Sequence, residues 1–328
     1  MEIIERAFNE NIWSSNIFKR YFDNLNCIFL DIETTGISSE QNKVILAGIL
    51  ENKGSSFIIR QYFAEKKEEE KEILEHIVEV LSKAHIIINY NATSFDIPFL
   101  NRRFQKNNIP FCIGSYCSFD LHKIIKKYGF ITLPDYKLKT IEKYMGIERT
   151  DTISGQESID IYNEYIKNKD TALKEKILAH NFEDVYFLTK LLPILSKMDL
   201  HKIMFENCRY INTDMNCKII IKKSVLKKHF LQVEGICTGK NSDYTAFFCG
   251  YEIQFSSEKN EFLLKIPLYE SKNSQYILLN DLDFHYNKQI SYAQIPEDVL
   301  IIKNGDLINH IEINAFLDVL LPHIFGNI

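Results

Sequence analysis

The sequence predicts an α/β protein, in which a mixed sheet flanked by helices is followed by a smaller β-rich C-terminal domain. Two observations lead to this prediction. Up to about residue 197, short apolar runs are followed by segments whose apolar residues recur every three or four positions, as in strands followed by amphipathic helices. Beyond residue 200, short alternating runs rich in β-branched and aromatic residues predominate, as in antiparallel strands.

The elements are expected in the following order. Residues 1–25 form an N-terminal helical extension, residues 26–198 form the α/β domain, and residues 199–328 form a β-rich accessory domain. The expected strands are 27–30, 44–50, 57–63, 85–89, 218–221, 245–255, 261–268, 276–279 and 299–302. The expected helices are 69–83, 97–107, 119–128, 138–145, 157–168, 172–197 and 312–324.

Composition excludes several classes of protein. The 328 residues carry a net charge of −5, with 45% hydrophobic and 25% charged side chains, which is ordinary for a globular chain and unlike a disordered one. No apolar run approaches the roughly 18 residues of a membrane span, and the N-terminus lacks the pattern of a secretory signal. Seven cysteines without a CxxC pair favour reduced thiols over disulfides or a zinc site. We therefore expect a cytoplasmic protein that does not enter a membrane.

Charge is unevenly distributed in the C-terminal part. Residues 197–240 carry nine Lys/Arg against four Asp/Glu, whereas residues 241–328 carry five against twelve. The basic stretch includes Lys222, Lys223 and Lys227-Lys228. These side chains could contact the phosphates of a nucleic acid, or they could form a solvated face.

The first candidate site residues stand at the end of an apolar run, where the sequence from residue 30 reads Leu-Asp-Ile-Glu-Thr-Thr-Gly. Because side chains alternate along a strand, Asp31 and Glu33 face the same side of the sheet. Neighbouring carboxylates repel each other unless a cation lies between them, and Mg²⁺ and Mn²⁺ prefer oxygen ligands. Acids at this spacing also occur by chance, but this pair ends a buried strand just before a turn.

A second candidate, Asp96, lies in the segment after the strand at 85–89. Asp96 could be the N-cap of the next helix, since Pro98 suits a first helical turn. It could instead project from the edge of the sheet toward a bound cation. Asn91, in the same segment, could likewise be a turn residue.

The third group lies in the long helix at 172–197. His180 and Asp184 are four residues apart and so share one helix face. They could form an ordinary surface pair, and the adjacent Glu183 could be the inward-facing acid instead. Apolar residues on roughly the face of Asp184 favour Asp184.

Together the three segments supply four carboxylates and a histidine, a side chain that titrates near neutral pH. Two-metal phosphoryl transfer requires this combination, because acids hold two divalent cations and a base takes the proton of the attacking water. The sequence therefore predicts a metal-dependent site for phosphoryl transfer.

Over residues 25–197 the sequence resembles DEDD-type exonucleases of the ribonuclease H-like superfamily, and among them the predicted exonucleases of the YprB family. Residues 29–36 match the first motif, residues 90–91 with 95–103 match the second, and residues 180–184 match the third. Residues 146–149 and 153–155 are similar to the segments before the third motif. His180 precedes Asp184 by four residues, which is the spacing of the subclass that carries tyrosine at this position.

The resemblance implies a ribonuclease H-like fold for residues 26–198. It implies a 3′–5′ exonuclease that hydrolyses phosphodiester bonds of single-stranded DNA or RNA with two Mg²⁺ or Mn²⁺ ions. It also implies catalytic and substrate-binding residues. The metal ligands would be Asp31, Glu33, Asp96 and Asp184, the general base His180, and the substrate contacts Thr34, Asn91 and Arg103.

Two other functions stay open at this stage. One is a nucleic-acid-binding module that keeps the fold without turnover, and the other is a structure-specific endonuclease that uses the same acids. The sequence does not distinguish DNA from RNA. It also does not indicate the oligomeric state, the cellular pathway, protein partners or the role of residues 199–328.

Overall fold

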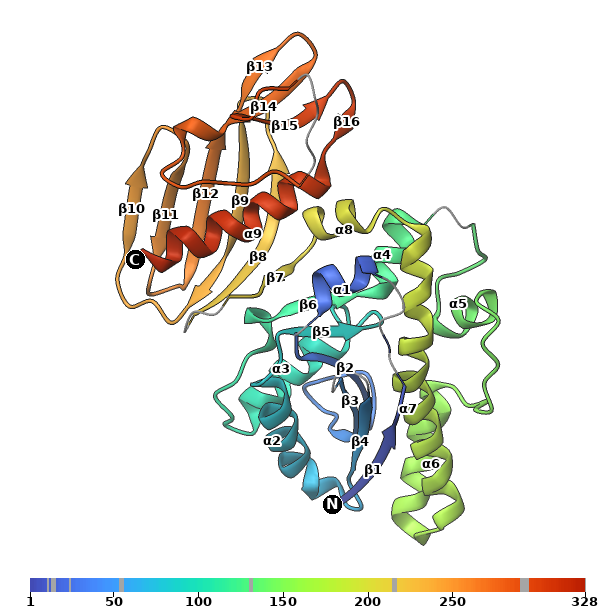
Figure 1. Ribbon diagram of the computed structural model, residues 1–328. Helices are drawn as coiled ribbons and strands as arrows, with labels where there is room; N and C mark the ends of the chain where they lie inside the picture. The colour runs from blue at the N-terminus through green and yellow to red at the C-terminus, as the bar shows by residue number, and fades with distance from the viewer. Residues whose placement is uncertain are drawn as a thin grey trace. The chain divides into compact units, whose positions relative to one another are not determined.

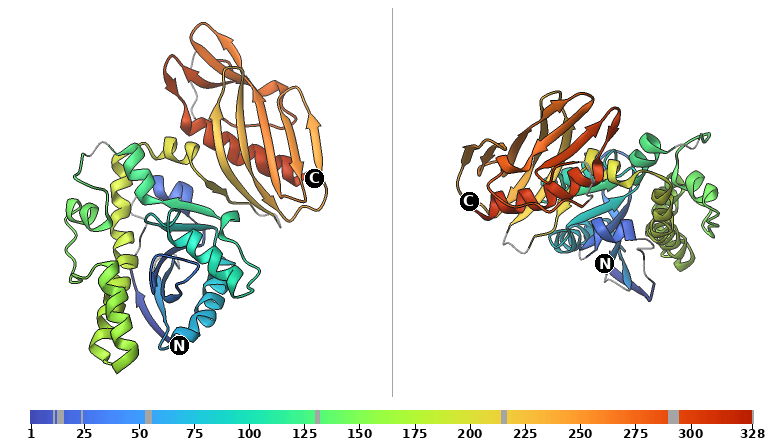
Figure 2. Two further views of the ribbon diagram at one scale, coloured as in Figure 1. Left: turned by 180° about the vertical axis from the view of Figure 1, so that it is seen from behind. Right: turned by 45° about the horizontal axis from the view of Figure 1, so that its top comes forward.

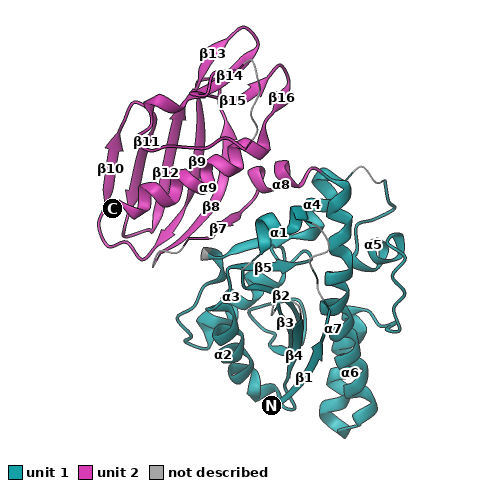
Figure 3. Cartoon of the chain, viewed as in Figure 1, with its two compact units in different colours: residues 1–198 teal, residues 199–328 magenta. Residues whose placement is uncertain are grey.

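The computed structural model describes residues 1–10, 12, 16–23, 25–52, 56–129, 132–213, 217–289 and 295–327. The chain forms two compact units, residues 1–198 and 199–328, which are described separately (Figure 3). All seven cysteines are reduced, and four of them are buried. Within the described ranges, no helix has the length and apolar character needed to cross a lipid bilayer.

The first unit is built on a six-stranded mixed sheet with the strand order β1-β4-β3-β2-β5-β6 (Figure 1). Strands β1, β4, β3 and β2 pair antiparallel with their neighbours in this order. Strands β2, β5 and β6 pair parallel. The central strands β2 and β3 are buried almost throughout, as their continuous apolar runs predict. The strands are β1 (Glu2–Phe8), β2 (Cys27–Thr34), β3 (Val44–Asn52), β4 (Phe57–Phe63), β5 (Ile86–Asn89) and β6 (Cys117–Asp120).

Helices cover both faces of this sheet, with α2 and α3 on one face and α6 and α7 on the other (Figure 1, Figure 2). The helix expected at 172–197 continues past Leu191 only as a 3₁₀ segment, because Pro193 has no N–H to donate. The helices are α1 (Asn16–Phe22), α2 (Glu70–Leu81), α3 (Asp96–Lys106), α4 (Leu121–Tyr128), α5 (Leu138–Tyr144), α6 (Gly155–Asn168) and α7 (Thr171–Leu191). The 3₁₀ segments are η1 (Lys67–Glu69), η2 (Ile113–Ser115) and η3 (Leu192–Lys197).

The expected helical extension over residues 1–25 is corrected by the structure. Glu2–Phe8 forms the edge strand β1, which pairs along its whole length with β4, and the described helix of this region is limited to Asn16–Phe22. The short sequence of β1 has no clear alternation, so its hydrogen-bonding partner, some fifty residues away in the chain, determines its conformation.

Helix α7 passes directly over β3 at Gly48. A Cβ atom at this position would lie 2.3 Å from Asn181 Oδ1, so the helix approaches closely because residue 48 has no side chain. The buried Gln61 amide donates to the Leu178 carbonyl at 2.8 Å and to Asn181 Oδ1 at 2.9 Å. These contacts fix the position of α7 relative to the central strands.

A buried ion pair joins α2 and α3. Arg103 Nε and Nη2 donate to the two carboxylate oxygens of Glu70 at 2.7 and 2.6 Å, and the two side chains are 8% and 3% exposed. Glu70 also accepts the N–H of Val44 at 2.9 Å. The pair therefore links both helices to the start of β3 and holds in place the helix that begins at Asp96.

The second unit contains a six-stranded antiparallel sheet, in the order β10-β11-β12-β9-β8-β7, and a four-stranded sheet, in the order β13-β14-β15-β16. Helix α9 packs on the larger sheet, where the ring of Phe325 contacts Phe255 and Phe262. The helices are α8 (Leu200–Glu206), η4 (Leu279–Asp281) and α9 (His310–Gly326). The strands are β7 (Arg209–Ile211), β8 (Lys218–Leu226), β9 (Phe230–Thr238), β10 (Tyr244–Phe247), β11 (Glu252–Ser256), β12 (Glu261–Pro267), β13 (Tyr269–Ser271), β14 (Ser274–Leu278), β15 (Val299–Asn304) and β16 (Leu307–Ile308).

Two expectations for this unit change. The strand expected at 245–255 is a hairpin of β10 and β11, because the chain turns between them with the N–H of Phe248 donating to the Tyr251 carbonyl at 2.8 Å. Helix α8 and strands β7, β9, β13 and β16 were not expected, although β9 alternates fully between buried and partly exposed positions. The β-rich character predicted for residues 199–328 is confirmed.

We predict that Arg103→Met lowers the free energy of unfolding by about 3–5 kcal/mol, because it leaves the Glu70 carboxylate buried without its cation. The matched control is Arg102→Met on the same helix. Arg102 pairs with Glu40 at the surface, so its loss should change stability by less than about 1 kcal/mol. Urea unfolding of the two variants measures the difference, and equal losses would contradict the structural role of Arg103.

Candidate active site

Strand β2 carries two acids toward helix α7. Asp31 Oδ2 accepts a hydrogen bond from Asn181 Nδ2 at 2.9 Å, and Glu33 Oε1 lies 3.5 Å from His180 Nε2. The pairing register with β3 shifts between Glu33 and Thr34, so the strand becomes irregular just after the second acid. Alternation along β2 therefore places both carboxylates on the face that α7 covers.

Asp96 is the first residue of α3 but not its N-cap. The N-cap is Phe95, and no side chain caps this helix end. The Oδ1 atom of Asp96 instead accepts the N–H of Ile32 at 3.2 Å, and the side chain is buried. Of the two interpretations open from the sequence, the structure supports the one in which Asp96 projects toward the acids of β2.

Helix α7 contributes His180 and Asp184 to the same region. His180 Nε2 lies 3.9 Å from Asp184 Oδ2. Glu183 points elsewhere, because its carboxylate accepts the backbone N–H groups of Thr150 and Asp151 at 3.1 and 3.0 Å. The phase of the helix thus separates the two adjacent acids, and Asp184 is the one that faces β2.

These side chains line one cavity of about 750 Å³. Two of the expected substrate contacts, Thr34 and Asn91, also line it. Arg103 is not among its lining residues, since its guanidinium is held by Glu70, so we leave it out of the proposed site. The cavity brings together Asp31, Glu33, Asp96, His180 and Asp184.

Burial and mutual repulsion raise the pKa values of the acids in the cavity. Burial raises the pKa of Asp31 well above its ordinary value, and the nearby carboxylates of Asp184, Asp96 and Glu33 raise it further. Burial likewise raises the pKa of Glu33 to about 7, although the charge of His180 opposes this. Burial raises the pKa of Asp96 to about 7 against the hydrogen bonds that it accepts from the backbone. Without a cation, the cluster is therefore electrostatically strained.

His180 is oriented by Asp151, a residue that sequence reasoning missed. His180 Nδ1 lies 2.7 Å from Asp151 Oδ2, and the Asp151 side chain is only 3% exposed. Burial by itself would raise the pKa of Asp151, but the hydrogen bond and the charge of His180 bring it below its ordinary value. An ionised Asp151 accepts the proton of Nδ1, so Nε2 is the nitrogen that faces Glu33 and Asp184.

Arg149 is a second residue without a predicted role. Its guanidinium forms an ion pair with Asp184, lies 3.1 Å from Glu142 and 3.3 Å from Glu183, and is 7% exposed. Coulombic attraction to Asp184 helps to raise the pKa of Arg149 despite its burial. Arg149 thus holds the segment between α5 and α6 against α7.

The sequence contains one signal that could have pointed to these two residues. Residues 146–149 and 153–155 resemble family segments, and they flank Asp151 in a stretch with no helical periodicity. No rule of local spacing indicates that this segment would pack beside His180.

The residues present fit divalent cations. The candidate ligands in the cavity are carboxylate oxygens, which Mg²⁺ and Mn²⁺ prefer, and burial and three neighbouring carboxylates raise the pKa of Asp31 among them. Glu33, His180 and Asp184 each offer a ligand atom within 4.8 Å of the others. These three residues could hold an ion, and Asp31 and Asp96 line the same cavity.

Comparison with solved structures gives distant likenesses. One is a family B DNA polymerase from the hyperthermophilic archaeon Pyrobaculum calidifontis, at 18% identity and a TM-score of 0.43, covering 53% of this chain and 24% of that chain. Another is exonuclease I in its apo form, at 12% identity and a TM-score of 0.37, covering 61% of this chain and 57% of that chain. A further structure of exonuclease I has 12% identity and a TM-score of 0.37, covering 65% and 55% of the two chains. This chain spans less than two thirds of the length of each of these proteins.

No curated protein matches the sequence. The family model described as the RNase_H superfamily matches residues 28–196, which is more than half of the chain and includes all of the acids described above. The chain therefore belongs to the RNase_H superfamily.

Proposed function

We propose that this protein is a metal-dependent 3′–5′ exonuclease that hydrolyses phosphodiester bonds of single-stranded DNA or RNA. The observation that carries the proposal is the convergence of four acids, from β2, α3 and α7, on one cavity together with His180. Membership of the RNase_H superfamily supports nuclease chemistry. The resemblance of the three sequence motifs to DEDD-type exonucleases supports attack at a 3′ end.

The four acids divide between two ion sites in this proposal. Asp31, Glu33 and Asp184 would hold one ion, and Asp31 and Asp96 would hold the other. Two Mg²⁺ or Mn²⁺ ions would supply the positive charge that lowers the pKa of an attacking water and stabilises charge on the phosphate. Glu33 and Asp96 suit this role, because burial raises the pKa of each to about 7, and the nearby carboxylate of Asp184 contributes to both shifts.

His180 would take the proton of the attacking water at Nε2. Asp151 fixes the ring by accepting the proton of Nδ1, which leaves Nε2 able to act as a base. Nε2 faces the space beside Glu33 and Asp184, at 3.5 and 3.9 Å. Asp151 is therefore a positioning residue in this mechanism.

The activity is tested with 5′-labelled single-stranded DNA and RNA, linear and circular, in Mg²⁺ or Mn²⁺. We expect linear strands to be shortened stepwise from the 3′ end and circular strands to stay intact. Cutting of the circle would establish an endonuclease instead. Binding without any metal-dependent cutting would establish a nucleic-acid-binding module. The same gel shows whether DNA or RNA is preferred.

We predict that Asp31→Asn lowers the hydrolysis rate by about 10³-fold or more, because charge stabilisation by the ions is worth several kcal/mol and each 1.4 kcal/mol is tenfold. In EDTA, the Tm of this variant should be equal to or higher than that of the wild type, because one repelling charge is removed. The matched control is Asp160→Asn, an exposed acid on α6, which should change neither property.

The same acids predict a pH dependence of stability in EDTA. The folded-state pKa values of Glu33 and Asp96 are raised to about 7, above their unfolded values near 4, so the folded protein binds more protons between these limits. The free energy of unfolding should therefore fall as the pH rises from about 5 to 7. Chemical denaturation measures this slope, and saturating Mn²⁺ should flatten it. A wild-type slope of opposite sign would contradict the strained cluster.

We predict that Asp151→Ala lowers kcat by about 10- to 100-fold with little change in KM, a loss of the size seen when hydrogen-bond partners of active-site metal ligands are removed. In ¹⁵N-histidine NMR spectra of the metal-free protein, the variant should lose the signature of a His180 ring protonated at Nδ1. Asp160→Ala serves as the control. Unchanged kcat together with an altered NMR signal would show that the orientation of His180 does not matter for the reaction.

A further inference from the structure

Asp151, the acid that orients His180, has a cationic partner with no role assigned so far. Lys139 Nζ donates to Asp151 Oδ2 at 3.1 Å, and the same oxygen lies 2.7 Å from His180 Nδ1. Lys139 belongs to α5, Asp151 to the segment between α5 and α6, and His180 to α7. One carboxylate oxygen therefore joins three parts of the chain.

The two oxygens of Asp151 have separate partners. Oδ1 accepts the N–H of Ile153 at 3.0 Å. Oδ2 faces Lys139, His180 and also Arg149, whose Nη2 lies 3.6 Å away. At 3.6 Å Arg149 contributes positive charge but no hydrogen bond. Within the described part of the chain, the hydrogen bonds to Oδ2 therefore come from Lys139 and His180.

Lys139 also donates to the backbone carbonyl of Ile153. Its amino group thus bridges the side chain of Asp151 and the backbone two residues further on. Residues 151–154 have no regular secondary structure, so side-chain contacts of this kind determine where Asp151 lies. The Asp151 side chain is only 3% exposed, which leaves water little access to replace the lysine.

The two partners differ strongly in burial. The side chain of Lys139 is 42% exposed, whereas that of Asp151 is almost fully enclosed. Arg149 stays beside Asp151 when Lys139 is replaced, so a substitution at Lys139 does not leave a buried carboxylate without a cation. We therefore expect the geometry of Asp151 to depend on Lys139 more than the stability of the fold does.

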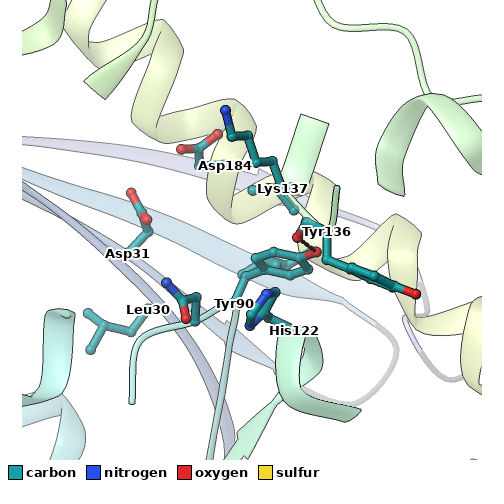
Figure 4. Close-up of a pocket in the computed structure, with 10 residues that line it drawn as sticks. Leu30, Asp31, Tyr90, His122, Tyr136, Lys137 and Asp184 are labelled. Atoms are coloured by element: carbon teal, nitrogen blue, oxygen red, sulfur yellow. Dashed lines mark hydrogen bonds between the residues drawn. The ribbon is translucent and has the colours of Figure 1, made fainter. Parts of the chain in front are cut away.

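Two lysines at the start of α5 lie near the acids in different ways. A second cavity, of about 390 Å³, shares Asp184 and Lys137 with the larger one, and Figure 4 shows the side chain of Lys137 extending toward Asp184. Lys139 lines the larger cavity, but its amino group is bound to Asp151 and Ile153. The hydrogen bonds of Lys139 are therefore directed to the protein rather than to a ligand.

We propose that Lys139 is a positioning residue, which holds Asp151 so that Asp151 presents His180 with Nε2 toward the acids. This inference rests on the proposed function, in which His180 takes the proton of the attacking water at Nε2. Among the contacts of the described residues, none joins Lys139 directly to His180. The effect of Lys139 on the site passes through Asp151.

The test compares Lys139→Met with Lys139→Arg in steady-state hydrolysis of a 5′-labelled single-stranded oligonucleotide with Mg²⁺. Methionine keeps an unbranched side chain and removes the amino group. Lys139→Met should lower kcat about tenfold with little change in KM, the size of one hydrogen bond to a charged group. Lys139→Arg should retain most of kcat, because a guanidinium can donate to both acceptors. Lys143→Met is the matched control, since Lys143 is exposed one turn further along α5 and lines neither cavity.

The ¹⁵N-histidine NMR spectrum reports the state of His180 without turnover. Its signals are identified by their loss in His180→Gln. The wild type, Lys139→Arg and Lys143→Met should show a ring protonated at Nδ1. Lys139→Met should show a smaller share of this form, because Asp151 is then less firmly held.

A double-mutant cycle separates action through Asp151 from direct contact with a substrate. In the Asp151→Ala background, Lys139→Met should lower kcat no further, because the group through which Lys139 acts is gone. The inference is overturned if Lys139→Met leaves kcat and the His180 spectrum unchanged, whatever its KM. It is also overturned if Lys139→Met lowers kcat equally in both backgrounds.

The two proposals can fail separately. If the wild type hydrolyses no strand, but Lys139→Met alters the His180 spectrum and Lys139→Arg does not, the positioning role stands and the exonuclease proposal falls. If the wild type hydrolyses strands and Lys139→Met behaves as the wild type does, the positioning role alone falls. Thermal unfolding identifies a variant that fails to fold, and Lys139→Gln then takes the place of Lys139→Met.

Discussion

The constraint on which the structure depends is the repulsion among four acids enclosed at one end of a sheet. Burial and neighbouring negative charge both raise the pKa of Asp31, so the cluster would separate if its backbone were free to move. Three structural features keep the acids together. Asp31 and Glu33 stand on the part of β2 that pairs with β3, Asp96 is held by the backbone of Ile32, and α7 packs closely over Gly48. The fold thus holds carboxylates close together despite their mutual repulsion.

The surroundings of the cluster partly compensate its charge. Arg149 pairs with Asp184, and His180 lies between Glu33 and Asp151. Both contacts depend on residues 146–154, which follow α5 and carry no regular structure of their own. This segment connects to α7 through the Glu183 carboxylate, which accepts two of its backbone N–H groups. An irregular segment thus determines which nitrogen of His180 is presented to the acids.

Two cavities open on the acid cluster, one on each side of it. The acids lie where the cavities meet, with aromatic rings at the far end of the smaller one. In the proposed function, the acids would hold the phosphate of a nucleic acid strand where the two cavities meet.

Local rules explain what could be predicted. Alternation along β2 places Asp31 and Glu33 on one face, and helical spacing does the same for His180 and Asp184, so these two pairs and the α/β class followed from the sequence alone. The roles of Asp96, Arg103 and Asp151 did not, because each depends on a partner 64, 33 or 29 residues away in the chain. The local sequence allowed Asp96 to be an N-cap, the family resemblance gave Arg103 as a substrate contact, and no local pattern indicated a role for Asp151. Strand β1 is a similar case, since its conformation depends on pairing with β4. The sequence by itself determined which residues are candidates for the chemistry, and the tertiary structure decided which of them meet, because hydrogen bonds and ion pairs between distant segments leave no periodic pattern in the chain.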